Sequence, residues 1–351
     1  MRRTIHASTL ALTLAALAAF ASPANAQTRR GAQAPRTTGA TTTRAQKPSA
    51  AETVPLPASD ALLAVDLEKL FKEVVPRALA NDSAKLAQVN ADVEQFKTRT
   101  GIDASAFDRL VVGARFVRLE SGALKLDNVT AVARGTVNVA TLGASIRAAS
   151  KGAVAEQQYG GKTVYVTTVN DTIKIFGLAK VRLKELAVTA LDAETIALGE
   201  PEDVRAAIDA QAGKRPRADM SMLPNPKGPT DFIGFGGNVP AGTLEGVETG
   251  LPGLDRAIGS IQGFYGSVGS TTAGIQMMTT LRAGSAADAK QLFDSLDALR
   301  QIAPSLVAMM GDKGKFAQNA INSLKLTTKG NEVQLRLEVP QADITSLLRV
   351  L

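Results

Sequence analysis

Cysteine is absent from the 351-residue chain, and histidine occurs once, at His6. The lack of cysteine excludes disulfides and thiolate ligands, and a lone histidine cannot build the imidazole sets of zinc, iron or copper sites. Neither a Ser-His-Asp nor a Cys-His nucleophilic site can form once His6 is removed with the export signal described below. We therefore expect no bound cofactor or metal, and carboxylate chemistry is the main enzymatic route left.

Aromatic side chains are scarce, at 4% of residues and without tryptophan. A nucleic-acid-binding domain would combine clustered Lys and Arg with aromatic stacking surfaces. Most of the formal net charge of +7 lies before residue 59, because residues 1–26 hold +2 and residues 27–58 hold +4. The remaining +1 leaves no basic domain, and nucleic acid is not expected as a partner.

Long apolar runs are also missing. The apolar run over residues 10–21 follows two arginines and leads into Ala24, Asn25, Ala26 and Gln27. A membrane-spanning helix needs about 20 apolar residues, so this short run fits a signal peptide with an A-x-A cleavage site. We predict that residues 1–26 are cleaved before Gln27. The mature chain is then periplasmic or secreted and has no transmembrane segment.

Residues 27–54 are rich in Thr, Ala, Arg, Gln and Pro and nearly free of branched aliphatic residues. Such a segment buries too little apolar surface to offset the entropy of ordering, which predicts a disordered basic linker. It is either a passive tether or an electrostatic attachment to an anionic envelope component. The chain's other partners are left unknown.

An internal repeat organises the rest of the chain. Residues 107–113 are echoed by 254–259 at an offset of 147, and the apolar strand at 129–134 is echoed by 277–282 at an offset of 148. Matching offsets favour a duplication. The predicted units are repeat 1 over residues 55–211, a linker over 212–218, and repeat 2 over 219–351.

Each repeat is expected to be an antiparallel β-meander with helices packed on one face, an α+β class. Turn signals lie at residues 120–122, 170–171 and 329–331. The expected strands are 61–65, 129–134, 231–235, 277–282 and 333–339, and the expected helices are 67–79, 84–99, 139–149, 201–211, 286–302 and 341–351. The two repeats share one sheet or form separate lobes.

Several short motifs of the chain are similar to those of a known group of proteins. They include Thr100-Gly101-Ile102-Asp103, Ala133-Arg134-Gly135 and the segment from Tyr159 to Tyr165. With these motifs the chain resembles a group of exported bacterial proteins built on a duplicated α+β repeat, a domain of unknown function. The resemblance implies the fold and no site residues.

Paired carboxylates are the remaining enzymatic candidates, as in glycosidases. Aspartates expected near strand ends are Asp60, Asp66, Asp103, Asp108 and Asp255. The few aromatic residues argue against a sugar site, and Asp103 and Asp108 fit turn or cap positions. The glycine run at 234–237 lacks the remaining features of a nucleotide loop and fits a tight strand exit.

These exclusions favour a non-enzymatic, exported envelope binding or structural module. Two alternatives stay open, which are an apolar-ligand (lipid-like) carrier and a carboxylate-dependent hydrolase. A large apolar cavity would favour the carrier, and two facing acids in a cleft would favour the hydrolase.

Signal processing is directly testable. N-terminal sequencing of the exported protein should begin at Gln27, because the A-x-A site ends at Ala26. Recovery of intact Met1 from a membrane fraction would contradict the assignment of residues 1–26 as a cleaved signal.

Overall fold

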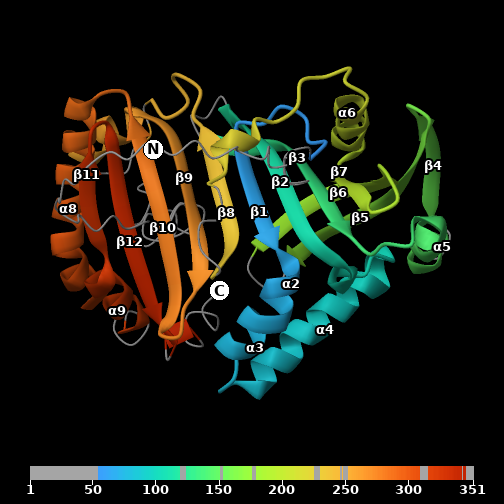
Figure 1. The fold of residues 1–351 in the computed structure, drawn as a ribbon, viewed down its shortest axis with the longest axis horizontal. Helices are drawn as coiled ribbons and strands as arrows, with labels where there is room; N and C mark the ends of the chain where they lie inside the picture. Colours follow the sequence, from blue (N-terminus) through green and yellow to red (C-terminus); the bar gives the residue numbers. More distant parts are fainter. Residues whose placement is uncertain are drawn as a thin grey trace, which may run out of the picture.

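The computed structural model describes residues 54–118, 124–150, 153–175, 179–224, 230–245, 247, 252–308, 315–341 and 343–344. Its strands form one twelve-stranded sheet in which all neighbouring strands are antiparallel (Figure 1). The α+β class is therefore confirmed.

The strands are β1 (Ala61–Asp66), β2 (Phe107–Arg118), β3 (Leu124–Gly135), β4 (Val154–Tyr159), β5 (Lys162–Ile175), β6 (Ala179–Ala190), β7 (Thr195–Gly199), β8 (Asp231–Asn238), β9 (Ile261–Ser270), β10 (Gly274–Ala283), β11 (Lys325–Lys329) and β12 (Glu332–Pro340). The α-helices are α2 (Leu67–Lys69), α3 (Val75–Ala78), α4 (Ser83–Thr100), α5 (Val139–Ala149), α6 (Pro201–Gln211), α7 (Pro252–Gly259), α8 (Ala286–Ala308) and α9 (Lys315–Ser323). Shorter helical segments are η2 (Leu70–Val74), η3 (Ala104–Ala106) and η4 (Met220–Met222).

Pairing of β1 with β8 joins the two halves of the chain. Across this junction Leu63 lies opposite Phe235, and on its other side Leu63 lies opposite Val112 of β2. Outward from the junction the strands run β1-β2-β3-β7-β6-β5-β4 on one side and β8-β9-β10-β12-β11 on the other. The strands expected from the two repeats therefore share one sheet.

The repeat alignment at an offset of 147 is wrong. Residues 107–113 lie in β2, whereas residues 254–259 lie in helix α7, although Phe107 and Leu254 are both buried. A hexapeptide's own preference is weak, and the contacts around it decide between helix and strand. The segments matched at an offset of 148 are both strands, in β3 and β10. Two repeats are not shown by the structure, and the duplication with its boundaries stays a prediction.

Helix predictions with clear start signals are confirmed. Helix α5 follows Asn138, whose side chain accepts a hydrogen bond from the Ala140 N–H, and α6 begins at Pro201. The turn at 329–331 is also confirmed between β11 and β12. The turn at 170–171 is wrong, since these residues lie within β5. The turn at 120–122 and most of the helix at 341–351 lie outside the described residues.

Helices cover both faces of the sheet, so the expectation of helices on one face is wrong. On β6, Leu186 and Val188 belong to the core that contains Ile146 of α5. Ala187 belongs instead to the core that contains Val204 of α6. Because neighbouring strand residues point to opposite faces, α5 and α6 lie on opposite sides of the sheet.

The glycine run at 234–237 lies inside strand β8 and is not a strand exit. A Cβ atom added to Gly236 would collide with the backbone carbonyl oxygen of Met222, so the chain at η4 passes directly over β8. Glycine is needed here for close backbone approach. This crossing also fixes Leu223 at the edge of the groove described below.

A matched pair of glycine substitutions tests this packing. We expect Gly236→Ala to lower the free energy of unfolding by about 1 to 3 kcal/mol or more, because backbone atoms must move to admit the methyl group. Gly259→Ala is the control, since a Cβ there meets nothing within 4 Å and the residue ends helix α7. In urea unfolding, the free energy of unfolding of the control should equal that of the wild type or exceed it by up to about 1 kcal/mol. Equal stability of the two variants would contradict the close approach.

Candidate functional site: a charged groove across the central strands

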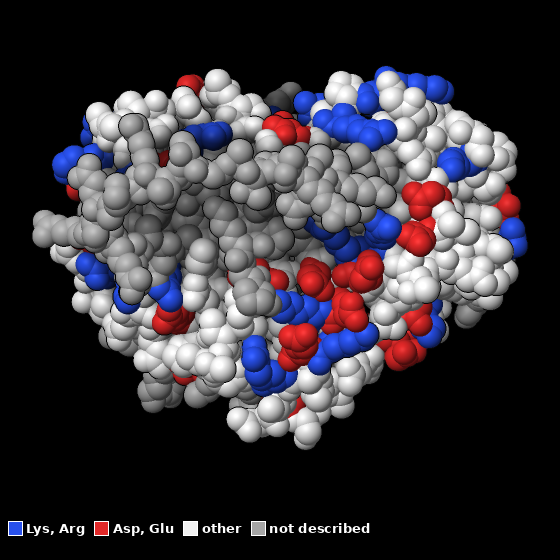
Figure 2. All heavy atoms as spheres, in the orientation of Figure 1, with Lys and Arg blue, Asp and Glu red and all other residues white. Residues whose placement is uncertain are grey.

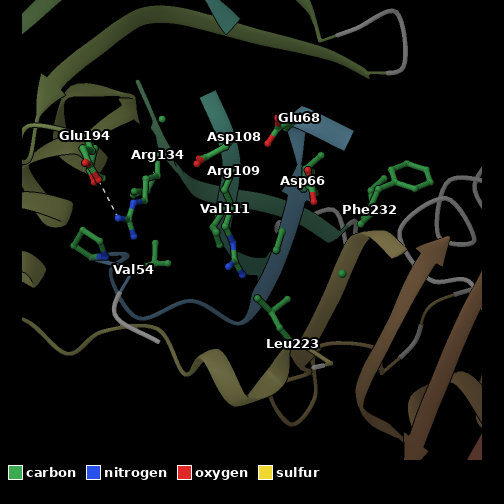
Figure 3. Close-up of a pocket in the computed structure, with 18 of the residues that line it drawn as sticks. Val54, Asp66, Glu68, Asp108, Arg109, Val111, Arg134, Glu194, Leu223 and Phe232 are labelled. Carbon is green, nitrogen blue, oxygen red and sulfur yellow. Dashed lines mark hydrogen bonds and ion pairs between the residues drawn. The ribbon is translucent and has the colours of Figure 1, made fainter. Parts of the chain in front are cut away.

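A groove of about 1090 Å³ crosses the ends of β1, β2, β3 and β8, at the junction of the two halves (Figure 3). Its apolar lining includes Ala64, Val111, Val132, Leu223 and Ile233. Its charged lining comprises Asp66, Glu68, Asp108, Arg109, Arg134, Asp192, Glu194, Arg217 and Asp231. The groove therefore combines an apolar floor with charges of both signs.

A bulge in β2 directs the side chain of Arg109 toward this groove. Phe107 pairs with Gly135, and the next pair is Arg109 with Arg134, so Asp108 is an extra residue in the ladder. Phe107 consequently packs in the core with α5, whereas Arg109 shares the opposite face with Val111, which belongs to the core under α6. Because of the bulge, Phe107 and Arg109 point to opposite faces of the sheet although they are only two positions apart.

Several groove carboxylates already have local structural partners. Asp66 caps helix α2 by accepting a hydrogen bond from the Lys69 N–H at 2.8 Å. Glu68 accepts a hydrogen bond from Lys72, which holds the pKa of Glu68 below its ordinary value. Asp192 accepts the N–H of Glu194 at 2.9 Å in the turn before β7. The contact with Lys72 favours the ionised form of Glu68, unlike the protonated acid that general-acid catalysis requires.

Arginines contribute the remaining contacts. The Glu194 carboxylate lies 2.9 Å from the Arg134 guanidinium, the ion pair drawn in Figure 3. Arg217 donates hydrogen bonds to the carbonyl oxygens of Ala210 and Gln211, so it ties the chain after α6 back onto that helix. Arg217 is thus structural, and Arg109 and Arg134 are the groove's two arginines with side chains on the sheet face.

The structure brings two of the five candidate aspartates together. Asp66 and Asp108 line the groove, while Asp60, Asp103 and Asp255 do not. Asp60 accepts the N–H of Phe116 at 3.0 Å. Asp103 is a cap residue as expected, and its hydrogen bonds with Lys97 and then Ser105 keep its pKa below the ordinary value.

Sequence reasoning missed Arg109, Arg134 and Glu194 as site residues. The sequence feature that could have indicated the two arginines is a lone arginine beside an apolar strand segment. Arg109 precedes Leu110-Val111-Val112, and Arg134 follows the apolar stretch of β3. The sequence could not show that these two positions face each other. That fact depends on the register between β2 and β3.

Basic and acidic residues are interspersed over the middle of the face drawn in Figure 2.

Among the described residues, no group of three or more acidic, histidine or cysteine side chains is arranged to hold a metal ion. Within the same parts of the chain, no helix has both the length and the apolar character needed to cross a bilayer.

Chelation should leave the protein unchanged, since the described residues hold no acidic or histidine cluster arranged for a metal and the chain has no cysteine. Thermal unfolding of the mature protein with and without EDTA should give the same midpoint. A drop of several degrees with EDTA, restored by calcium, would reveal an oxygen-ligated ion.

No family model matches the chain, and no curated protein matches it. Among solved structures, it is distantly similar to TP0453. Crystal form I has 9% sequence identity and a TM-score of 0.43, with 84% of this chain and 96% of that chain covered. Crystal form III has 8% identity and a TM-score of 0.45, with 85% and 97% covered.

Proposed function

We propose that the chain is a non-enzymatic, exported binding module of the cell envelope and that the groove across β1, β2, β3 and β8 is its ligand site. The observation that carries the proposal is the position of the groove, where both halves of the chain supply lining residues. Ligand sites are typically concave, and polar groups in them orient the ligand.

The charge arrangement supports binding over hydrolysis. A glycosidase needs one carboxyl group kept protonated and a second one facing it across the bond to be cleaved. In the groove, Asp66 caps a helix, Glu68 is paired with Lys72, and Glu194 is paired with Arg134. Each of these contacts leaves the carboxylate in a structural role.

Export and attachment follow from the N-terminal sequence. The predicted signal over residues 1–26 places the mature chain in the envelope or outside the cell, and the basic linker supplies five cationic side chains against one acidic residue over residues 27–54. Such a linker attracts anionic polymers and headgroups. In this proposal the linker holds the module at the envelope, and the groove selects the ligand.

Co-sedimentation of the mature protein with purified envelope fragments tests both parts. We expect Ala193→Trp to reduce the bound fraction several-fold, because this exposed turn residue lines the groove and tryptophan would narrow it. The matched control is Ala87→Trp, on the exposed side of α4. Unfolding curves should show that both variants fold.

The linker is tested in the full mature chain by replacing Arg29, Arg30, Arg36, Arg44 and Lys47 with glutamine. Binding should then depend less on salt while the groove dependence remains. Equal binding by Ala193→Trp and wild type would overturn the groove as the ligand site. Release of cleaved products, lost in Asp66→Asn and Asp108→Asn, would instead show a hydrolase.

A further inference from the structure

Two arginines lie side by side on the groove face of the sheet. Arg109 of β2 and Arg134 of β3 are direct cross-strand partners. Strand alternation puts them on the same face as Val111 and Val132, which belong to the core under α6. Like charges directly opposite each other destabilise a sheet, and arginine cannot relieve the repulsion by losing its proton. An oxyanion held between the two guanidinium groups would offset this repulsion.

The carboxylates around the arginines leave room for such an anion. Arg134 is paired with Glu194, but their side chains are 48% and 63% exposed, and exposed pairs contribute little to stability. Arg109 lies opposite Asp66 in the register, and Asp66 is engaged as the cap of α2. Within the residues that the structure describes, no ion pair of the Arg109 guanidinium is seen.

Two of the groove carboxylates, Asp108 and Glu68, lie away from the arginine side chains. In Figure 3 the side chains of Arg109 and Arg134 extend toward Val54 and Leu223, while Asp108 and Glu68 lie toward the opposite end. Glu68 is further neutralised by its ion pair with Lys72 at 2.8 Å. An anion at the arginine end therefore meets two guanidinium groups before it meets an unpaired carboxylate.

Apolar side chains continue from the arginines. Val111 and Val132 come next on the same face of their strands and are buried in the core, whereas the half-buried Ala64 and Leu223 line the groove. A ligand that carries one oxyanion and an apolar chain would satisfy both parts of the groove. A free inorganic anion would satisfy only the arginines.

We propose that the Arg109–Arg134 pair binds the oxyanion of an amphiphilic ligand, a carboxylate or phosphate monoester whose apolar chain lies along Ala64 and Leu223. The planar guanidinium forks match the two oxygens of either group. This inference deepens the proposed function and rests on the groove being the ligand site.

Isothermal titration of the mature chain with octyl phosphate, octanoate, inorganic phosphate and octyltrimethylammonium tests the ligand class. We expect octyl phosphate and octanoate to bind, inorganic phosphate to bind about tenfold or more weakly, and the ammonium compound not to bind. Binding of the ammonium compound alone, or of none of the four at millimolar concentration, would overturn the proposal. Equal affinity for inorganic and octyl phosphate would contradict the proposal that the apolar chain of the ligand contacts the groove.

Substitutions identify the residues. Arg109→Gln and Arg134→Gln should each weaken octyl phosphate binding about tenfold or more, since each removes a charge-assisted hydrogen-bond donor. Arg147→Gln is the matched control, because Arg147 is also 48% exposed and paired with a glutamate, Glu156, but lies away from the groove. An equal loss in the control would show a nonspecific charge effect.

Glu194→Gln separates ligand binding from a merely structural role. It releases Arg134 from its ion pair, so octyl phosphate should bind several-fold more tightly while stability changes little. If the arginines serve only to stabilise the sheet, this variant weakens or leaves binding unchanged, and the proposal fails.

The outcomes also distinguish this inference from the proposed function. If Ala193→Trp abolishes envelope binding but octyl phosphate does not bind, the groove is a ligand site for a different class of ligand. If octyl phosphate binds through the arginines but Ala193→Trp leaves envelope binding unchanged, the anion site is supported. The proposal that the groove binds the envelope is then contradicted.

Discussion

The antiparallel pairing of β1 with β8 is the contact on which the rest of the architecture depends. β1 has only six residues, yet it pairs with β2 on one side and, on the other, with β8, which lies about 170 residues later in the sequence. Without it the sheet would divide into two parts. The groove would then be lost as well, because Ala64 and Asp66 line it from one half and Ile233 and Gly234 from the other.

Local irregularities adapt this continuous sheet to a site. The extra residue Asp108 in β2 lets Phe107 enter one core while Arg109 faces the groove. Gly236 allows the Met222 backbone to cross β8 and hold Leu223 as a wall. Bulges and close-approach glycines are common means of redirecting side chains near functional sites. Here they put two arginines on the face of the sheet that lines the groove.

The electrostatics of the groove fit recognition better than bond cleavage. Several of its carboxylates serve in caps and ion pairs, and the contact with Lys72 lowers the pKa of Glu68. The arginines keep their charge under all physiological conditions. Fixed charges of this kind can orient a ligand of opposite sign.

The sequence by itself determined the available chemistry and the elements with strong local signals. The lack of cysteine and the single histidine limited the side chains a site could use, and Asn138 and Pro201 marked the starts of α5 and α6 because capping involves residues only a few positions apart. Tertiary structure decided which strands pair, which face each helix covers, and that Arg109 meets Arg134. Those features depend on register and bulges set by contacts between distant segments, so short similarities such as 107–113 with 254–259 could not fix them.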